Sequence, residues 1–332
     1  MGNGKGCLEN LVLGKEGVVE KVTVRRKSKS SPVRRTSPVR HYATVTSRYY
    51  ILKFLTQFLA LKRLEKGKFQ YHLLCMDDLV YEVFDRLNLD SLSLYLLRDW
   101  ESEELEAVKE DRNLAEYCWT VKPPFLLYLM ETNPEMPAIT FLDSDLFPFA
   151  SLSPVWEALN GDSVLLYPHR FPPELDFLNQ ASGRYNAGMI TFKNDVYGQA
   201  AARWWTEKVL EWCYHRDENG RLGDQKYLLR FAELFENVAE CNHRGINVGP
   251  WSVGNYQVKS QKGMVFVDGV QLRLFHFHQF ELREDLTYQP AAPFYKLNEE
   301  TIENIYEPYN TRLVDALKMV RNHFPAFKTV TD

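Results

Sequence analysis

The chain has 332 residues, of which 45% are hydrophobic and 14% aromatic, so it can bury a sizeable core in one large α/β domain or in about two domains. Its net charge of −4 is uneven, because residues 1–40 contain ten Lys and Arg against three Glu, which leaves −11 on the remainder. Five scattered cysteines with no C-x-x-C pair argue against a disulfide framework and a zinc knuckle. There is no apolar run of membrane-spanning length and no apolar core of a signal peptide, so we expect a soluble cytoplasmic protein without a transmembrane segment.

Residues 21–40 read KVTVRRKSKSSPVRRTSPVR, a segment that is basic, rich in Ser and Pro and nearly free of large apolar side chains. Such a segment cannot bury enough apolar surface to order itself, so the sequence predicts a disordered basic arm over residues 1–40. The segment has no aromatic side chains to stack on bases, and we therefore do not expect a nucleic-acid partner.

From His41 onward the patterns of strands and helices alternate. The first half of the chain predicts strands at 41–47, 70–76 and 92–97, and then a strand from Ala138 that ends in Asp143-Ser144-Asp145. Helices are predicted at 49–67, ended by Gly67, and at 77–89, capped by Asp77 or Asp78. A third helix is predicted from Leu114 to Glu131, broken or kinked at Pro123-Pro124. This alternation predicts an α/β fold with a doubly wound, mostly parallel sheet flanked by helices, in which ligands bind at the carboxyl ends of the strands.

The second half of the chain is less regular. It predicts strands at 163–168 and 189–192, a helix at 195–216, and a late β-hairpin at 264–278 that turns at Asp268-Gly269. Residues 298–324 have the apolar spacing of a packing helix, with a break near Pro308. We therefore expect one domain over residues 41–285 and a C-terminal helical tail, residues 286–332, that packs on its core.

Residues 141–149 read FLDSDLFPF, in which two aspartates interrupt an apolar run. A carboxylate among Phe and Leu side chains loses hydration unless a partner or a cation compensates for the loss. Residues i and i+2 of an extended strand point to the same side, so Asp143 and Asp145 could address one ligand, and their oxygen donors suit Mg²⁺ or Mn²⁺. A surface turn with two acids is the alternative, and the pair alone does not decide between the two.

Three further segments carry polar side chains that suit a ligand site, and each has an ordinary structural alternative. Residues 186–188, Asn-Ala-Gly, let a ligand approach the backbone before an apolar strand, but they are also a common turn. Asp224 and Gln225 open a helix, where Asp224 could simply be the N-cap. His276 and His278 alternate onto one face of a late strand, where an imidazole could bind Mn²⁺ beside carboxylates or could lie in the core.

Taken together, the order D-S-D, N-A-G before a strand, D-Q opening a helix and a late H-F-H resembles nucleotide-sugar glycosyltransferases of the GT-A fold. It is similar to the retaining branch that includes glycogenin and bacterial lipopolysaccharide galactosyltransferases. The segments YPHRFPP, GRYNAGMITF, GDQKYL and LFHFH also resemble an uncharacterised bacterial group of nucleotide-diphospho-sugar transferases. The resemblance covers roughly residues 41–285 and implies a metal-dependent hexosyltransferase, related to the retaining branch, that moves a sugar from a nucleotide-diphospho-sugar to a glycan, lipid or protein acceptor.

For the metal and the phosphates, the resemblance implies that Asp143 and Asp145 bind Mn²⁺ (or Mg²⁺) and that these residues also hold the donor's ribose and diphosphate. His276 would be the third protein ligand, with His278 as the alternative. Lys122 would neutralise the donor phosphates.

For the sugar and the nucleotide, the resemblance implies that Asn186 and Gly188 line the sugar pocket. Asp224 would hold sugar hydroxyls and Gln225 would lie beside the reacting anomeric carbon, so these two are the expected catalytic residues. Thr46, at the end of the first strand, would hold the nucleotide base and ribose.

The sequence departs from the retaining branch after the late histidines. That branch follows its His with a Gly and then a Lys that reaches the diphosphate, whereas the corresponding residues here are Gln279 and Leu282, with Arg283 as a substitute. The departure leaves open whether configuration is retained, and whether the domain binds a nucleotide sugar without turnover.

Two other enzyme classes fit the sequence less well. A nucleotidyltransferase would have a Gly-rich loop after the first strand, where this chain reads TVTSRYYIL. A haloacid-dehalogenase-like phosphatase carries its Asp-x-Asp in the first strand before a Gly/Thr turn, whereas Leu146-Phe147-Pro148 follows here, well into the chain.

Overall fold

The computed structural model describes residues 39–66 and 68–329. The expected arm over residues 1–40 therefore lies almost wholly outside the described residues, and so does Gly67 at the end of the first predicted helix.

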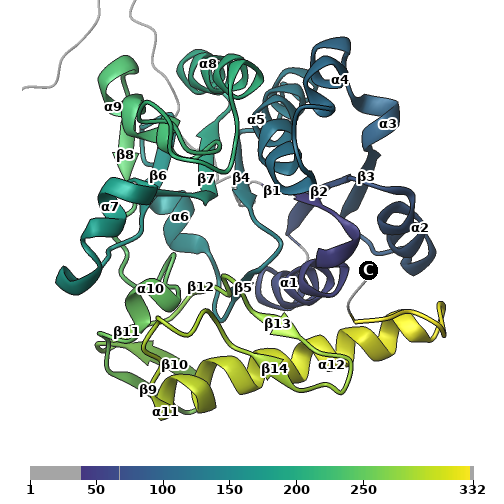
Figure 1. Cartoon of the computed structure of the whole chain (residues 1–332), viewed down its shortest axis with the longest axis vertical. Coiled ribbons are helices and arrows are strands. Elements are labelled where there is room, and N and C mark those ends of the chain that lie inside the picture. The colour runs from purple at the N-terminus through teal and green to yellow at the C-terminus, as the bar shows by residue number, and fades with distance from the viewer. Residues whose placement is uncertain (1–38, 67, 330–332) are drawn as a thin grey trace, which may run out of the picture. The chain divides into compact units, whose positions relative to one another are not determined.

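A seven-stranded mixed sheet forms the centre of the described chain, in the order β3-β2-β1-β4-β7-β6-β8 (Figure 1). Its strands are β1 Arg40–Thr46, β2 Phe69–Cys75, β3 Leu92–Leu96, β4 Ala138–Leu142, β6 Val164–Pro168, β7 Tyr185–Lys193 and β8 Val238–Glu240. The pairs β1–β2, β2–β3, β1–β4 and β6–β8 are parallel, while β7 is antiparallel to both β4 and β6. The mostly parallel α/β sheet is confirmed, with β7 running opposite to the other strands.

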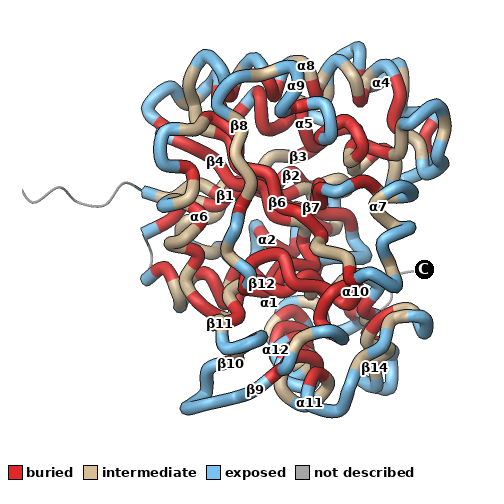
Figure 2. The backbone as a smooth tube through the Cα atoms, turned by 90° about the vertical axis from the view of Figure 1, so that its left-hand side faces the viewer, coloured by how far each residue is buried: buried red, intermediate tan, exposed pale blue. Residues whose placement is uncertain are grey.

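Both faces of the sheet are buried, because side chains that alternate along each strand enter two different hydrophobic clusters. On β2, for example, Leu73 joins one cluster and Leu74 the other. Helices α4, α5 and α8 cover the second face, and α1, α2, α6 and the late elements cover the first (Figure 1). In Figure 2 the central strands β2, β4, β6 and β7 are buried along most of their length, whereas β3 and β8 at the sheet edges are half-buried. The exposed segments include loops, outer helix faces and the strands at residues 258–267.

The main helices are α1 Ile51–Leu64, preceded by a 3-10 turn at Arg48–Tyr50, α2 Asp78–Leu87, α3 Leu97–Trp100, α4 Glu103–Lys109, α5 Leu114–Thr132, α6 Ser153–Ala158, α7 Phe177–Ser182 and α8 Val196–Glu211. The side chain of Asp77, and not that of Asp78, caps α2 by accepting a hydrogen bond from the backbone N–H of Val80. Later come a 3-10 helix at Lys226–Arg230, α9 Phe231–Leu234 and α10 Pro250–Val253.

Two predicted helices differ from the structure at identifiable residues. Helix α5 is continuous across Pro123 and Pro124 and not broken, because buried residues on both sides of the prolines pack it against α8 and the sheet. Helix α8 ends at Glu211, before the predicted end at residue 216. In its last turn the guanidinium of Arg112 donates hydrogen bonds to the carbonyls of Val209 and Leu210.

The late elements form small sheets beside α1. The hairpin of β10 Met264–Val267 and β11 Val270–Gln271 turns at Asp268-Gly269 as predicted, both with positive φ, and β9 Val258–Gln261 extends it. The next strand, β12 Leu274–His276, is not part of this hairpin and pairs with β5 Leu146–Pro148. A further pair is formed by β13 Glu281–Leu282 and β14 Tyr288–Gln289.

The C-terminal segment is helical from Glu299 to Arg321, in three parts: α11 Glu299–Thr301, a π-helical stretch at Ile302–Tyr306 and α12 Glu307–Arg321. The predicted break near Pro308 is instead this π-helical stretch. Pro308 lies just after this stretch, where a residue without an N–H cannot continue the regular α-helical hydrogen-bond pattern. Leu313 and Leu317 are buried in the cluster that contains α1, so α12 packs on the core.

Candidate active site

The turn after β4 carries both aspartates. It is closed by a hydrogen bond of 3.0 Å from the N–H of Leu146 to the carbonyl of Asp143. The side-chain amide of Gln57, on α1, donates to the carbonyls of Asp143 and Leu146, each at 2.7 Å. Asp143 and Asp145 therefore reach one site through a clamped turn, and not through the strand alternation that the sequence predicted.

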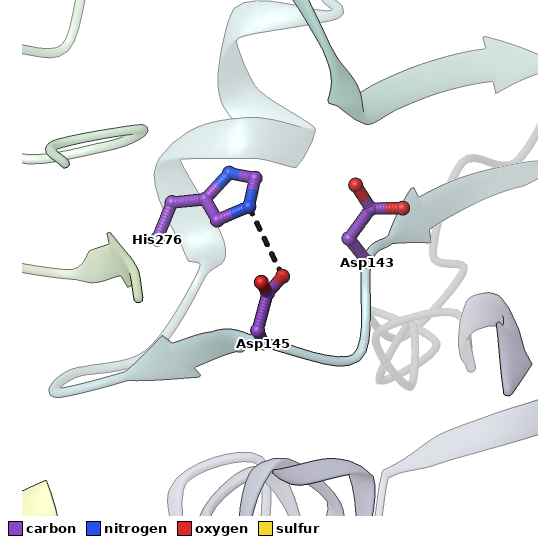
Figure 3. A group of neighbouring side chains, drawn as sticks. All are labelled: Asp143, Asp145 and His276. Atoms are coloured by element: carbon purple, nitrogen blue, oxygen red, sulfur yellow. Dashed lines mark ion pairs between the residues drawn. The ribbon is translucent and has the colours of Figure 1, made fainter. Parts of the chain in front are cut away.

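One donor atom from each of Asp143, Asp145 and His276 lies within 4.8 Å of the others, so the three could hold a metal ion (Figure 3). The pairing of β12 with β5 places His276 opposite Leu146 and so beside the turn. Its Nε2 is 3.0 Å from Oδ1 of Asp145, and its Nδ1 is 3.0 Å from Nδ2 of Asn186. The imidazole is thus held from both sides.

The antiparallel direction of β7 brings Asn186 and Gly188 to this site. Because β7 starts at the sheet edge where β4 ends, the carbonyl of Gly188 accepts a hydrogen bond of 2.7 Å from the N–H of Asp143. The prediction of a turn before the strand is wrong, since β7 already includes residues 186–188. A Cβ at Gly188 would lie 2.7 Å from Cε1 of His276 and 2.8 Å from Oδ2 of Asp143, so only glycine fits against the group.

Lys122, on α5, is buried between two carboxylates. Its Nζ lies 2.8 Å from Oδ2 of Asp224 and 3.4 Å from Oδ1 of Asp143, and it donates to the carbonyl of Ala187 at 3.1 Å. These three contacts match the three hydrogens of an ammonium group. Lys122 therefore ties Asp224 to the metal-competent group.

Gln225 is held at both ends of its amide. Its Oε1 accepts from the N–H of Ala187 at 3.1 Å, and its Nε2 donates to the carbonyl of Ser182 at 2.8 Å. The alternative in which Asp224 is an N-cap is not what the structure shows, because Gln225 occupies the N-cap position of the 3-10 helix at Lys226–Arg230 and the Asp224 side chain pairs with Lys122.

These residues line one cavity of about 570 Å³, a volume typical of small-molecule sites. Its wall includes the predicted residues Lys122, Asp143, Asp145, Asn186, Gly188, Asp224, Gln225, His276 and His278. It lies at the carboxyl ends of β1 and β4, as expected for a mostly parallel sheet.

Thr46 is the one predicted site residue that does not line the cavity. Its neighbours Val45 and Ser47 do, while Thr46 is fully buried and its hydroxyl is 2.7 Å from that of Ser144. Because Ser144 stands between the two aspartates, Thr46 supports the turn from behind and does not face a ligand.

The comparison with known proteins gives two relatives from Bacillus subtilis (strain 168). The chain is 34% identical to the uncharacterized protein YfnF over 285 residues, which cover 81% of this chain and 94% of YfnF. It is 28% identical to the uncharacterized protein YfnD, over 86% of this chain and 93% of YfnD. The chain belongs to the YfnF family. No protein-family model matches it.

Among solved structures, the YfnF-family fold is similar to that of the galactosyltransferase LgtC, solved in complex with donor and acceptor sugar analogs. The TM-score is 0.51 and the sequence identity 12%, over 83% of this chain and 95% of LgtC. At that identity the likeness shows the fold, and the expected GT-A architecture is confirmed.

The titratable residues of this site shift one another's pKa values in opposite directions. Burial raises the pKa of Asp143, and Asp145 adds to this, although Lys122 opposes it. Burial alone would also raise the pKa of Asp145, but His276 outweighs it and the pKa is lowered. Burial lowers and Asp145 raises the pKa of His276, and the net shift is upward. The half-buried carboxylate of Asp143 and the buried one of Asp145 lie together, and Lys122 is shared with Asp224, so the arrangement favours a bound cation.

The residues after His276 were expected to supply an alternative metal ligand, His278, and a phosphate-binding cation, Arg283. His278 lines the cavity, with its ring centroid 5.9 Å from that of His276, but it is not part of the metal-competent group. Leu282 is buried in β13, and Arg283, the expected substitute for a phosphate-binding lysine, is exposed and lines neither described cavity.

Three further residues shape the site although no sequence motif points to them. Gln57 is a polar side chain on the buried face of α1, and this is the signal that could have identified it. Asn247 is buried and accepts a hydrogen bond from Asn186 at 3.0 Å. Trp251 packs edge-on against His276, and no local pattern marks either of these last two residues.

No described helix is both long enough and apolar enough to cross a membrane.

Proposed function

We propose that this protein is a metal-dependent glycosyltransferase that moves a sugar from a nucleotide-diphospho-sugar to a glycan, lipid or protein acceptor. The observation that carries the proposal is the group of Asp143, Asp145 and His276 at the base of a cavity of about 570 Å³, in a GT-A fold. The likeness in fold to a galactosyltransferase supports a hexose as the transferred sugar.

The residues present fit a divalent cation. Two carboxylates and one imidazole form a donor set that suits Mn²⁺, and Mg²⁺ could occupy the same oxygens. The backbone of Gly188 leaves space beside the group that any side chain would fill. When bound, the cation would neutralise the charge that develops on the diphosphate as it leaves the sugar.

The chain's own residues would orient the donor. Lys122 fixes Asp224 at 2.8 Å, and a carboxylate held in that way can accept hydrogen bonds from sugar hydroxyls. The amide of Gln225 is fixed by Ala187 and Ser182, so it can lie against the reacting carbon without moving. A neutral amide is a weak nucleophile, so these residues would act by positioning. Retention of configuration fits such a site and belongs to the proposal.

His169 and Phe171 line the cavity on the side of α7, and their rings stack at 4.6 Å. They belong to the segment 167–177, which reads YPHRFPPELDF and is rich in prolines and aromatic side chains. We propose that this wall faces the acceptor.

The direct test is donor turnover. The protein with Mn²⁺ is incubated with UDP-, GDP-, ADP- and dTDP-hexoses, and release of nucleoside diphosphate is measured for wild type, for Asp145→Asn and for the surface control Asp90→Asn, whose side chain is 92% exposed. We expect wild type to release nucleoside diphosphate from one donor. Asp145→Asn should lose this release, and Asp90→Asn should keep it.

Two other results would redirect the proposal. Metal-dependent binding of a nucleotide sugar without release of nucleoside diphosphate, even with acceptor mixtures, would favour a GT-A-like binding module. Leu282, at the position where the retaining branch has a lysine that reaches the diphosphate, is the reason to test this alternative. Release of inorganic phosphate in place of nucleoside diphosphate would indicate a phosphatase.

A further inference from the structure

The cavity has few cations for the charge it would have to hold. Three carboxylates line it, those of Asp143, Asp145 and Asp224, and a nucleoside diphosphate adds two phosphates. Lys122 already has two carboxylate partners, Asp143 and Asp224, and one hydrogen-bond acceptor, the carbonyl of Ala187, within the protein. A divalent ion alone would leave a phosphate-bearing ligand under-compensated.

Lys53 lies next to the aspartate turn, on α1. It precedes Gln57 by one helical turn, so both side chains project from the same face of the helix. Gln57 holds the carbonyl of Asp143 at 2.7 Å, and this contact fixes that face against the turn. The Nζ of Lys53 lies 4.5 Å from the centroid of the Tyr50 ring, and Tyr50 lines the main cavity.

Lys53 also lines a second cavity of about 200 Å³, which shares Tyr49 and Tyr50 with the main one. Lys53 does not line the main cavity itself, but its ammonium lies against the Tyr50 ring that both cavities share. Among the described residues no carboxylate lies within ion-pair distance of it, although the side chain is partly buried. Burial lowers its pKa, while Asp145 and Glu281 act in the opposite direction. An unpaired, partly desolvated cation is a favourable site for an incoming anion.

We propose that Lys53 binds the diphosphate of the nucleotide, from the α1 side of the metal-competent group. The proposal rests on the proposed function and adds to it the cation that Leu282 and Arg283 do not supply. The competing role is purely internal, in which Lys53 only offsets the charge of Asp145.

The two roles predict different effects of removing the charge. If Lys53 contacts the diphosphate, Lys53→Met weakens nucleotide binding at saturating Mn²⁺, and Lys53→Arg largely preserves it. If Lys53 only offsets Asp145, its removal strengthens Mn²⁺ binding by lowering repulsion and leaves nucleotide binding at saturating Mn²⁺ unchanged.

The experiment is calorimetric titration of wild type, Lys53→Met, Lys53→Gln, Lys53→Arg and the control Lys62→Met, which removes a 40% exposed lysine from the same helix. The probes are Mn²⁺ alone, then the tightest binder among ADP, CDP, GDP, UDP and dTDP at saturating Mn²⁺, and then its parent nucleoside. We expect roughly 10- to 100-fold weaker diphosphate binding in Lys53→Met and Lys53→Gln, the scale of a lost charge-assisted hydrogen bond.

Little change is expected for the parent nucleoside or for Lys62→Met. Diphosphate binding within 2-fold of wild type in both neutral Lys53 variants would overturn the assignment of Lys53, and would leave the proposed function standing. If wild type binds none of the five diphosphates, the proposed function itself fails. Two neutral variants are used so that poor folding of one leaves the test intact.

Discussion

Gly188 offers a sharp test of the metal-competent group. In Gly188→Ala the new Cβ would lie 2.7 Å from Cε1 of His276, 2.8 Å from Oδ2 of Asp143 and 2.9 Å from Oδ1 of Asn186. Ordinary contact begins at 3.4 Å, so the imidazole and the carboxylate must move by about 0.7 and 0.6 Å. Metal sites tolerate deviations of only about 0.2 Å in ligand distance.

The displaced atoms are the ends of side chains, so folding should suffer less than the metal site. We expect a loss of unfolding free energy near the low end of the ~1–3 kcal/mol seen for overpacking, and Mn²⁺ binding weakened by at least about 10-fold. Mn²⁺ affinity can be measured by the paramagnetic signal of the free ion, and stability by urea unfolding.

Gly161→Ala is the matched control. Gly161 has a φ of +109° and open space around its Cβ position, so alanine strains the backbone there without approaching the site. That variant should lose stability and keep its Mn²⁺ affinity. Gly188→Ala binding Mn²⁺ within 2-fold of wild type would refute the assignment of the metal group.

Three further predictions concern stability. Gln57→Leu removes two buried hydrogen bonds to the aspartate turn, one to the carbonyl of Asp143 and one to that of Leu146, and should lower the unfolding free energy by about 2–4 kcal/mol in urea titrations. Lys122→Met leaves the carboxylates of Asp143 and Asp224 without their cation and should lower it by about 3–5 kcal/mol. Burial lowers the pKa of His169 to about 3, against a usual 6.5. Between these two pH values the His169 imidazole is therefore protonated in the unfolded chain and neutral in the folded one. Stability should therefore be full above pH 6.5 and fall below it, by about 2 kcal/mol at pH 5 from His169 alone.

Each of these has its own contradicting result. A Gln57→Leu protein within 0.5 kcal/mol of wild type, by the usual scatter of surface variants, would mean that the turn does not depend on the amide. For Lys122, a loss no larger than that of the exposed Lys62→Met would argue against a buried ion pair. An unfolding free energy that is constant from pH 7 to pH 5 would show that His169 is not held neutral.

The sequence was sufficient to predict the sheet and the composition of the site, because both depend on local patterns. Alternating apolar strands and helices specify a doubly wound sheet, and Asp143 follows a strand at an end where ligands bind. The direction of β7 could not be predicted, since an apolar strand of this kind pairs equally well either way. That direction is what brings Asn186 and Gly188 to the edge where β4 ends.

Other misses have a similar cause, because they depend on partners far away in the sequence. Thr46 ends β1 as predicted, yet its side chain turns to Ser144 and away from the cavity. Lys122 lines the cavity and its role towards phosphate stays a prediction, but its contacts with Asp224 and Ala187 could not be predicted from the sequence. Lys53 carries no local motif, and its place beside the turn is visible only once α1 is packed in position.

The central claim is that a nucleoside diphosphate and a divalent ion bind together at Asp143, Asp145 and His276. Thermal unfolding of wild type and Asp145→Ala, with and without Mn²⁺, against ADP, CDP, GDP, UDP and dTDP tests it most directly. For wild type, one nucleotide with Mn²⁺ should raise the midpoint by about 5 °C at roughly 100 times its Kd, and neither component alone should do so. The shift should vanish in Asp145→Ala. No shift with any nucleotide in folded wild type, or the same shift in Asp145→Ala, would contradict the claim.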